Sequence, residues 1–232
     1  MSRRHPIVPF DPDLFAPFFG AKISELKTEL LQGGACNSNY LVQQHHGTRY
    51  VCRIHSRGNP AQEKYVADLA RNVVPCPDYL WANDRVSVQS FIEGEHFQPT
   101  ASLVRDAGHI IARLSKIRLS RSGVICEDGT IRKFEGWPSF AEGLRNQLRQ
   151  ESIRNYLDDA TVASLSNLIT RTRAIWEDFE ACHSLVHGDF NSGNLLVMND
   201  AITGVLDWEF AHSGCFYMDV GNLTRHLDAC WQ

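Results

Sequence analysis

The 232 residues are enough for one large domain or two small ones, and 43% hydrophobic with 22% charged residues is ordinary for a soluble globular protein. The net charge of −4 gives no basic field for nucleic acid, although a mildly acidic surface is compatible with a cationic substrate. Seven cysteines without a CxxC pair favour reduced thiols in a cytoplasmic protein. We expect no signal peptide and no membrane association, because no apolar run approaches the about 20 residues that span a bilayer. Composition leaves the oligomeric state open.

The first part of the chain has the patterns of strands. Residues 1–20 are rich in Pro and Phe and predict an irregular arm packed by its aromatic rings. Residues 23–31 fit either a helix or a strand before a glycine pair. Aromatic and β-branched residues on both sides of a turn at 45–48 predict a β-hairpin. A helix at 60–71 and a strand at 86–92 follow.

After Pro99 the pattern changes to helices. Apolar residues at helical spacing predict a helix over 100–119, and Ser139 with Glu142 forms a capping box for a helix ending near 150. We predict one long amphipathic helix over 161–182 and a final one over 218–230. The change near residue 95 predicts two lobes, residues 1–95 and residues 96–232, with a cleft between them where a ligand binds.

Polar side chains interrupt the second lobe between short apolar runs. Asp189 and Asn194 lie in one loop, and Asp207 ends the next apolar run. Carboxylate and amide oxygens are the ligands that a hard cation such as Mg²⁺ prefers. A cation held there could in turn hold phosphates.

Several motifs, in order, resemble the aminoglycoside phosphotransferase and choline kinase-like family. His-Gly-Asp-Phe-Asn-Ser-Gly-Asn at 187–194 is similar to its HGDxxxxN catalytic loop, and residues 206–211 to its IDWExA metal segment. Residues 33–40 resemble the phosphate-covering loop GGxxNxxY, 51–54 the third strand, and 90–94 the linker between lobes. The resemblance implies an α+β, two-lobed protein-kinase-like fold with a small antiparallel β lobe and a larger, mainly helical lobe.

The resemblance also implies a role for each matching residue. Asp189 would be the catalytic residue that takes or orients the proton of the attacking hydroxyl, while Asn194 and Asp207 would bind Mg²⁺. Arg53 would contact the α- and β-phosphates and be held by Glu63. His187 would anchor the loop and would not act as the base. The implied nucleotide-binding residues are Gly33, Gly34, Ser38, Arg53, Glu63, Ser90, Phe91 and Ile92.

The expected function is therefore Mg²⁺-dependent transfer of a phosphoryl group from ATP or GTP to a hydroxyl of a small molecule. The motifs do not choose among aminoglycosides, choline, thiamine and other amino alcohols. The chain ends at Gln232, where relatives continue through helices that wall the acceptor site, so we expect a second lobe that is short at its C-terminal end. It is either trimmed or built around a different acceptor pocket.

Two other functions fit part of the sequence. A nucleotide-binding pseudokinase, which binds a partner without turnover, would keep the same motifs. A metal-dependent hydrolase would use Asp189, Asp207 and nearby histidines, but their spacing is unlike that of histidine-rich metal sites.

Overall fold

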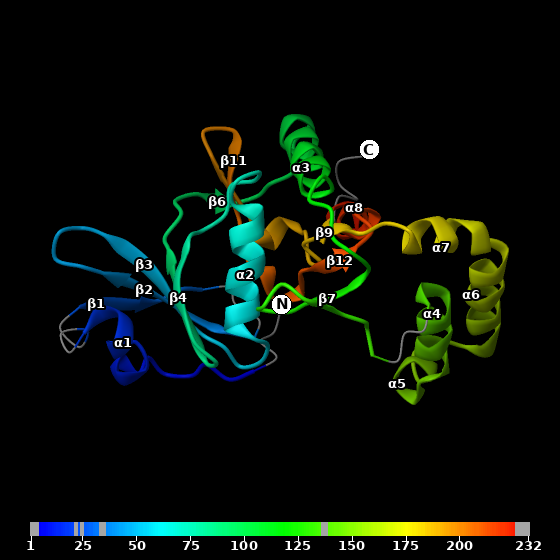
Figure 1. The fold of residues 1–232 in the computed structure, drawn as a ribbon, viewed down its shortest axis with the longest axis horizontal. Coiled ribbons are helices and arrows are strands. Elements are labelled where there is room, and N and C mark those ends of the chain that lie inside the picture. Colours follow the sequence, from blue (N-terminus) through cyan, green and yellow to red (C-terminus); the bar gives the residue numbers. More distant parts are fainter. Residues whose placement is uncertain (1–4, 21–22, 24–25, 33–35, 136–138, 226–232) are drawn as a thin grey trace.

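The computed structural model describes residues 5–20, 23, 26–32, 36–135 and 139–225. An antiparallel sheet with the N-terminal arm lies at one end, short strands with polar loops lie in the middle, and a group of helices stands at the other end (Figure 1). This is the predicted order of a β-rich part followed by a mainly helical part. None of the helices in these ranges is long and apolar enough to span a membrane.

The strands within the described residues form three antiparallel sheets. In spatial order the first contains β1 (Lys27–Leu30), β2 (Ser38–Gln43), β3 (Arg49–Ile54), β5 (Val86–Ser90) and β4 (Tyr79–Ala82). The second contains β11 (Ala201–Val205), β10 (Leu195–Met198) and β6 (Glu95–His96). The third contains β8 (Ile131–Arg132), β7 (Gly123–Ile125), β12 (His212–Gly214) and β9 (Ser184–Val186).

The predicted hairpin is confirmed. Strands β2 and β3 pair in register from Ser38 opposite Ile54 to Gln43 opposite Arg49. Burial alternates along β2, as expected for a strand with one face on a core. The stretch that fitted either a helix or a strand ends as β1, which pairs with β2.

The aromatic arm covers this sheet. It contains two short helical turns, η1 (Pro12–Leu14) and α1 (Ala16–Phe19), in an otherwise irregular path. Phe15 is fully buried and stacks on Phe10 with ring centroids 5.3 Å apart. The arm therefore supplies apolar surface that the sheet lacks on its own.

The remaining helices largely follow the predicted order. They are α2 (Pro60–Ala70), α3 (Ala101–Leu114), α4 (Phe140–Arg149), α5 (Glu151–Arg154), α6 (Asp159–Arg171), α7 (Arg173–Glu180) and α8 (Tyr217–Thr224), with the 3₁₀ turns η3 (Ser192–Asn194) and η4 (Trp208–Phe210). The prediction of one helix over 161–182 is wrong, because Thr172 has φ −99° and ψ 22° and separates α6 from α7. The end of the last predicted helix lies outside the described residues.

Helix α2 joins the two parts of the molecule. Asn59 caps it by accepting hydrogen bonds from the N–H groups of Ala61 and Gln62, and Pro60 occupies its first turn. Its residues Val66 and Ala70 pack in the same apolar core as the helices and strands of the second part. The position of α2 is thus fixed from both sides.

We predict that this shared core carries most of the stability. Leu114 of α3 is fully buried, so Leu114→Ala should lower the free energy of unfolding by about 2–5 kcal/mol through lost burial and a cavity. Leu168→Ala on α6 is the matched control, because that side chain is 53% exposed and its loss should cost less than about 1 kcal/mol. Urea unfolding followed by circular dichroism measures both, and equal losses would contradict the assignment of the core.

Candidate active site

The loop after β9 is held by the last helix. The carboxylate of Asp219, in α8, accepts hydrogen bonds from the backbone N–H groups of His187 (2.8 Å) and Gly188 (2.9 Å). Asn222, one turn later, donates to the carbonyl oxygen of Gly188 at 2.9 Å. Asp219 is completely buried, and this burial raises the pKa of its carboxyl group although the two N–H groups oppose the shift. Sequence reasoning assigned no role to this aspartate.

Two further contacts fix the path of the loop. Gly188 has φ +82°, and a Cβ atom there would lie 2.3 Å from the carbonyl oxygen of Phe210, so no larger residue fits. One ring nitrogen of the buried His187, Nε2, lies 2.9 Å from the carbonyl oxygen of Leu206. His187 therefore ties the loop to the segment before Asp207, in agreement with the expected anchor.

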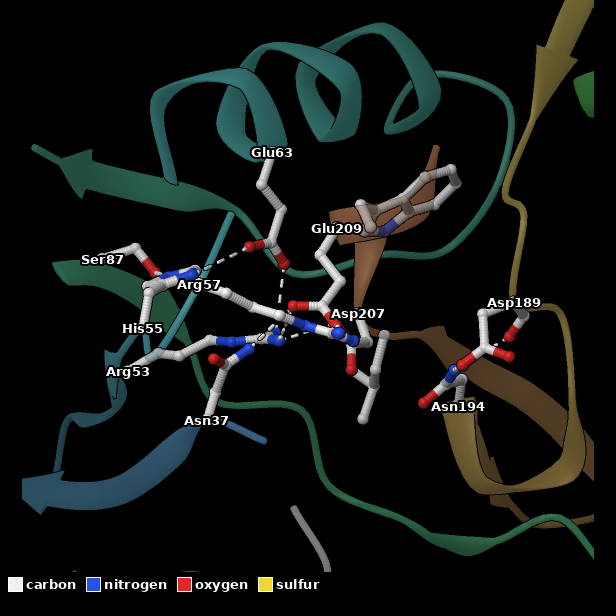
Figure 2. A network of polar contacts seen from close by, with 12 residues as sticks. Asn37, Arg53, His55, Arg57, Glu63, Ser87, Asp189, Asn194, Asp207 and Glu209 are labelled. Carbon is white, nitrogen blue, oxygen red and sulfur yellow. Dashed lines mark hydrogen bonds and ion pairs between the residues drawn. The ribbon is translucent and has the colours of Figure 1, made fainter. Parts of the chain in front are cut away.

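The carboxylate of Asp189 is half-buried and has a fixed orientation. Its Oδ1 accepts a hydrogen bond from the side chain of Asn191 (2.8 Å), and its Oδ2 accepts one from the side chain of Asn194 (3.0 Å). Because the Asn194 nitrogen faces Asp189, its amide oxygen is turned to the other side, toward Asp207 (Figure 2). The side-chain amide of Asn194 thus orients the carboxylate of Asp189, while its own oxygen remains available as a ligand.

Asp207 lies beside this loop at the end of β11. The backbone N–H of Leu206 donates to the carbonyl oxygen of Asn194 at 2.8 Å, which brings the two segments together. Asp207 has a left-handed backbone (φ 65°, ψ 71°). This conformation is uncommon for residues other than glycine, costs about 1–3 kcal/mol in strain, and occurs preferentially at functional sites. This turn directs its carboxylate toward Arg53 (Figure 2).

Arg53 is the buried cation of the site. Its guanidinium lies 3.1 Å from Glu63, 2.6 Å from Asp207 and 3.6 Å from Glu209. Burial would lower the pKa of Arg53, but Glu63 and Asp207 together raise it, so the group stays charged. The expected contact with Glu63 is present.

The carboxylates respond differently to this cation. Burial raises the pKa of Glu63 to about 7 against the opposing effect of Arg53. Burial also acts to raise the pKa of Asp207, but the charge of Arg53 and its hydrogen bond outweigh it and hold that pKa below its ordinary value. Asp207 therefore stays ionised at neutral pH.

The donor set fits a Mg²⁺–nucleotide complex. The Nε of Arg53 is buried and has no hydrogen-bond acceptor among the described residues, which suits an incoming phosphate oxygen. Asn194 and Asp207 supply oxygen ligands, and Mg²⁺ characteristically takes few from protein and the rest from phosphates and water. The same described residues contain no group of three His, Cys, Asp or Glu side chains that could hold a metal without such help.

Glu209 is a further member of the cluster that sequence reasoning did not single out. Its side chain is 8% exposed and accepts hydrogen bonds from Asn37 (2.9 Å) and Arg57 (3.4 Å). Asn37 belongs to the expected phosphate-covering loop, and Glu209 belongs to the expected metal segment. Asn37 is the asparagine of the first motif and Glu209 is the glutamate of the second. These two motif positions were the signals in the sequence that could have pointed to this contact.

The structure gathers only part of the predicted nucleotide-binding set. The hydroxyl of Ser38 is buried against the N-terminal arm, where it accepts from the N–H of Val8 at 3.0 Å. Ser90 and Phe91 donate their N–H groups to the carbonyl oxygens of Asp78 and Arg49. Ile92 packs on Gly204 of β11, so the linker touches the strand that leads to Asp207. Gly33 and Gly34 lie outside the described residues.

Part of the sequence resembles a known protein. The hygromycin-B 4-O-kinase of Escherichia coli is 36% identical over 67 residues, which are 29% of this chain and 20% of that protein. The alignment thus spans about a fifth of the curated relative.

Two crystal structures show the same fold. A thermostable mutant of aminoglycoside phosphotransferase APH(4)-Ia, in ternary complex with ADP and hygromycin B, has a TM-score of 0.66 at 18% identity, over 91% of this chain and 75% of that one. Macrolide 2′-phosphotransferase MphH from Brachybacterium faecium has a TM-score of 0.55 at 20% identity, over 90% and 74%. These likenesses confirm the predicted kinase-like fold.

The sequence also matches one family over most of its length. The model of the phosphotransferase enzyme family matches residues 27–231, so the chain belongs to that family.

Proposed function

We propose that this protein transfers the γ-phosphoryl group of ATP to a hydroxyl group of a small molecule. One observation carries the proposal: contacts join Asp189 to Asn194, Asn194 to Leu206 (the residue before Asp207), and Arg53 to both Asp207 and Glu63. A proton acceptor, oxygen ligands for a cation and a phosphate-binding cation therefore lie in neighbouring positions. Phosphoryl transfer uses these three kinds of group.

Asp189 takes the proton of the acceptor hydroxyl. Its two oxygens are oriented by Asn191 and Asn194, and neither partner carries a charge that would neutralise the carboxylate. The hydroxyl oxygen forms a bond to the γ-phosphorus as the bond from that phosphorus to the β–γ bridging oxygen breaks. The products are the phosphorylated acceptor and ADP, and the proton is left on Asp189 or passes to water.

Asn194 and Asp207 hold the cation, and Arg53 holds the phosphates. Bound Mg²⁺ supplies charge compensation for the phosphate oxygens. Arg53 keeps Glu63 on one side and offers its unpaired Nε–H to the nucleotide. The backbone around Ile92 is the proposed contact for the base, with ATP preferred because ADP occupies the structurally similar APH(4)-Ia complex.

We predict that Asp189→Asn lowers kcat by about 10²–10⁴, because the substitution keeps the size of the side chain and removes the proton acceptor. A coupled assay of nucleotide consumption measures it, with the best acceptor from a panel of aminoglycosides, choline, thiamine and other alcohols. Asp200→Asn in the exposed β10–β11 turn is the matched control and should keep full turnover.

Calorimetric binding of Mg²⁺–ATP should be unchanged in Asp189→Asn. Full turnover by this variant would contradict the role of Asp189. Tight nucleotide binding by the unaltered protein, with no turnover across the panel, would instead favour the pseudokinase.

We predict that Glu209→Ala raises the KM for Mg²⁺–ATP by about tenfold, the equivalent of one charge-assisted hydrogen bond of about 1.5 kcal/mol, with a smaller effect on kcat. Glu209 touches Asn37, Arg53 and Arg57, so its loss frees the phosphate-binding side chains. Glu209→Gln should recover part of the affinity, because it can still accept from Asn37.

Steady-state kinetics at a saturating acceptor concentration measures kcat and the KM for Mg²⁺–ATP separately. The exposed Glu151 at the start of α5 provides the control Glu151→Ala, which should leave both unchanged. A fall in kcat at constant KM would place Glu209 in the chemical step and contradict a positioning role.

A further inference from the structure

Tyr79 reaches from β4 into the buried cluster around Arg53. Its ring lies in the apolar core that also contains Val66 and Ala70 of α2. Its hydroxyl group donates a hydrogen bond of 2.6 Å to Oε1 of Glu63. The same oxygen meets the guanidinium of Arg53 at 3.1 Å. Tyr79 and Arg53 therefore share one oxygen of Glu63.

An irregularity in β4 aims the side chain of Tyr79 at this cluster. Tyr79 lies opposite Gln89 of β5. Trp81 lies opposite Val88, so two steps along β4 match one step along β5. In a regular strand Tyr79 and Trp81 would face the same side of the sheet. Here Tyr79 packs in the core with α2, and Trp81 packs against the core that contains the aromatic arm. Such bulges re-aim side chains and are common next to active sites.

The second oxygen of Glu63 has weaker support. Oε2 is buried and accepts no hydrogen bond within the described residues. Nδ1 of His55 lies 3.6 Å from Oε2, while Nε2 of the same ring lies 3.0 Å from the hydroxyl group of Ser87 (Figure 2). Burial lowers the pKa of His55 to about 3, so this ring is neutral and adds no positive charge. The hydroxyl group of Tyr79 thus supplies the short hydrogen bond from a neutral group that Glu63 accepts.

Glu63 has to be ionised and correctly oriented to hold Arg53. Burial acts to raise the pKa of Glu63, whereas the charge of Arg53 and the hydrogen bond from Tyr79 act to lower it. Burial and the neighbouring Glu63 raise the pKa of Tyr79 well above its ordinary value, so its O–H group remains a donor. A donor fixed in a core favours the charged form of a carboxylate and sets its direction. Tyr79 therefore acts on Arg53 through Glu63.

We propose that Tyr79 is a positioning residue for the nucleotide, because its hydroxyl group holds Glu63 in the orientation that turns Arg53 toward the phosphates. The inference rests on the proposed binding of Mg²⁺–ATP at Arg53, and it adds a residue that lies in none of the matching motifs. The partners of Asp189 are Asn191 and Asn194, so Tyr79 serves nucleotide binding and not the chemical step.

Tyr79→Phe tests this role, because the substitution keeps the buried ring and removes the hydroxyl group. It should weaken calorimetric binding of Mg²⁺–ATP by about three- to tenfold and raise the KM for the nucleotide by a similar factor, with kcat within about twofold of the unaltered protein. Tyr50→Phe is the matched control. Tyr50 lies on the strand that carries Arg53, but its hydroxyl group donates to Gln44 at 3.4 Å, so its loss should leave both constants unchanged. Circular dichroism checks that each variant is folded.

A double-mutant cycle separates action through Glu63 from a general loss of packing. In the Glu63→Gln protein, Tyr79→Phe should change Mg²⁺–ATP binding by less than about twofold, because the carboxylate through which it acts is gone. Unchanged nucleotide binding by the single variant, an equal loss in both backgrounds, or a fall in kcat at constant KM overturns the inference and leaves phosphoryl transfer standing.

Two further outcomes concern the proposed function itself. The predicted binding pattern without turnover across the acceptor panel supports the role of Tyr79 and counts against phosphoryl transfer. Absence of Mg²⁺–ATP binding by the unaltered protein overturns both proposals.

Discussion

The buried guanidinium of Arg53 is the interaction on which the other parts of the site depend. Removing such a charge from water costs several kcal/mol unless carboxylates meet it at close range. Here they come from distant parts of the sequence: Glu63 is 10 residues away, and Asp207 is 154 residues away. Satisfying Arg53 therefore places α2, β3 and the segment after β11 at fixed positions. Asp207 keeps its charge beside Arg53 and is therefore a suitable oxygen ligand for the Mg²⁺ of the proposed complex.

The loop that carries Asp189 depends on a second buried ionisable group, Asp219. Asp219 receives two backbone N–H groups of the loop, so α8 positions Asp189 without touching it. Asn194 accepts the N–H of Leu206, the residue before Asp207, with its backbone carbonyl, and it donates to Asp189 with its side chain. Asp219 and Arg53 are thus linked through this loop. A substitution of either residue should therefore affect Asp189, the proposed proton acceptor.

Local patterns predicted much of this architecture. The hairpin and α2 rest on short-range signals, namely β-forming residues around a turn and apolar residues at helical spacing, and the pairing of Arg53 with Glu63 was implied by the family resemblance. The break at Thr172 carried no such signal, because neither glycine nor proline marks it. Asp219 carried no signal in the sequence, and only the tertiary fold shows which donors it meets.

Calorimetric titration of Mg²⁺–ATP into Arg53 variants tests the central claim most directly. Arg53→Gln should bind about tenfold or more weakly, because it removes the charge that holds both carboxylates and phosphates. Arg53→Lys keeps the charge and should bind within about tenfold of the unaltered protein, and Arg71→Met, at an exposed arginine beyond α2, should bind equally well. A folded Arg53→Gln protein that binds Mg²⁺–ATP as tightly as the unaltered one would contradict the account.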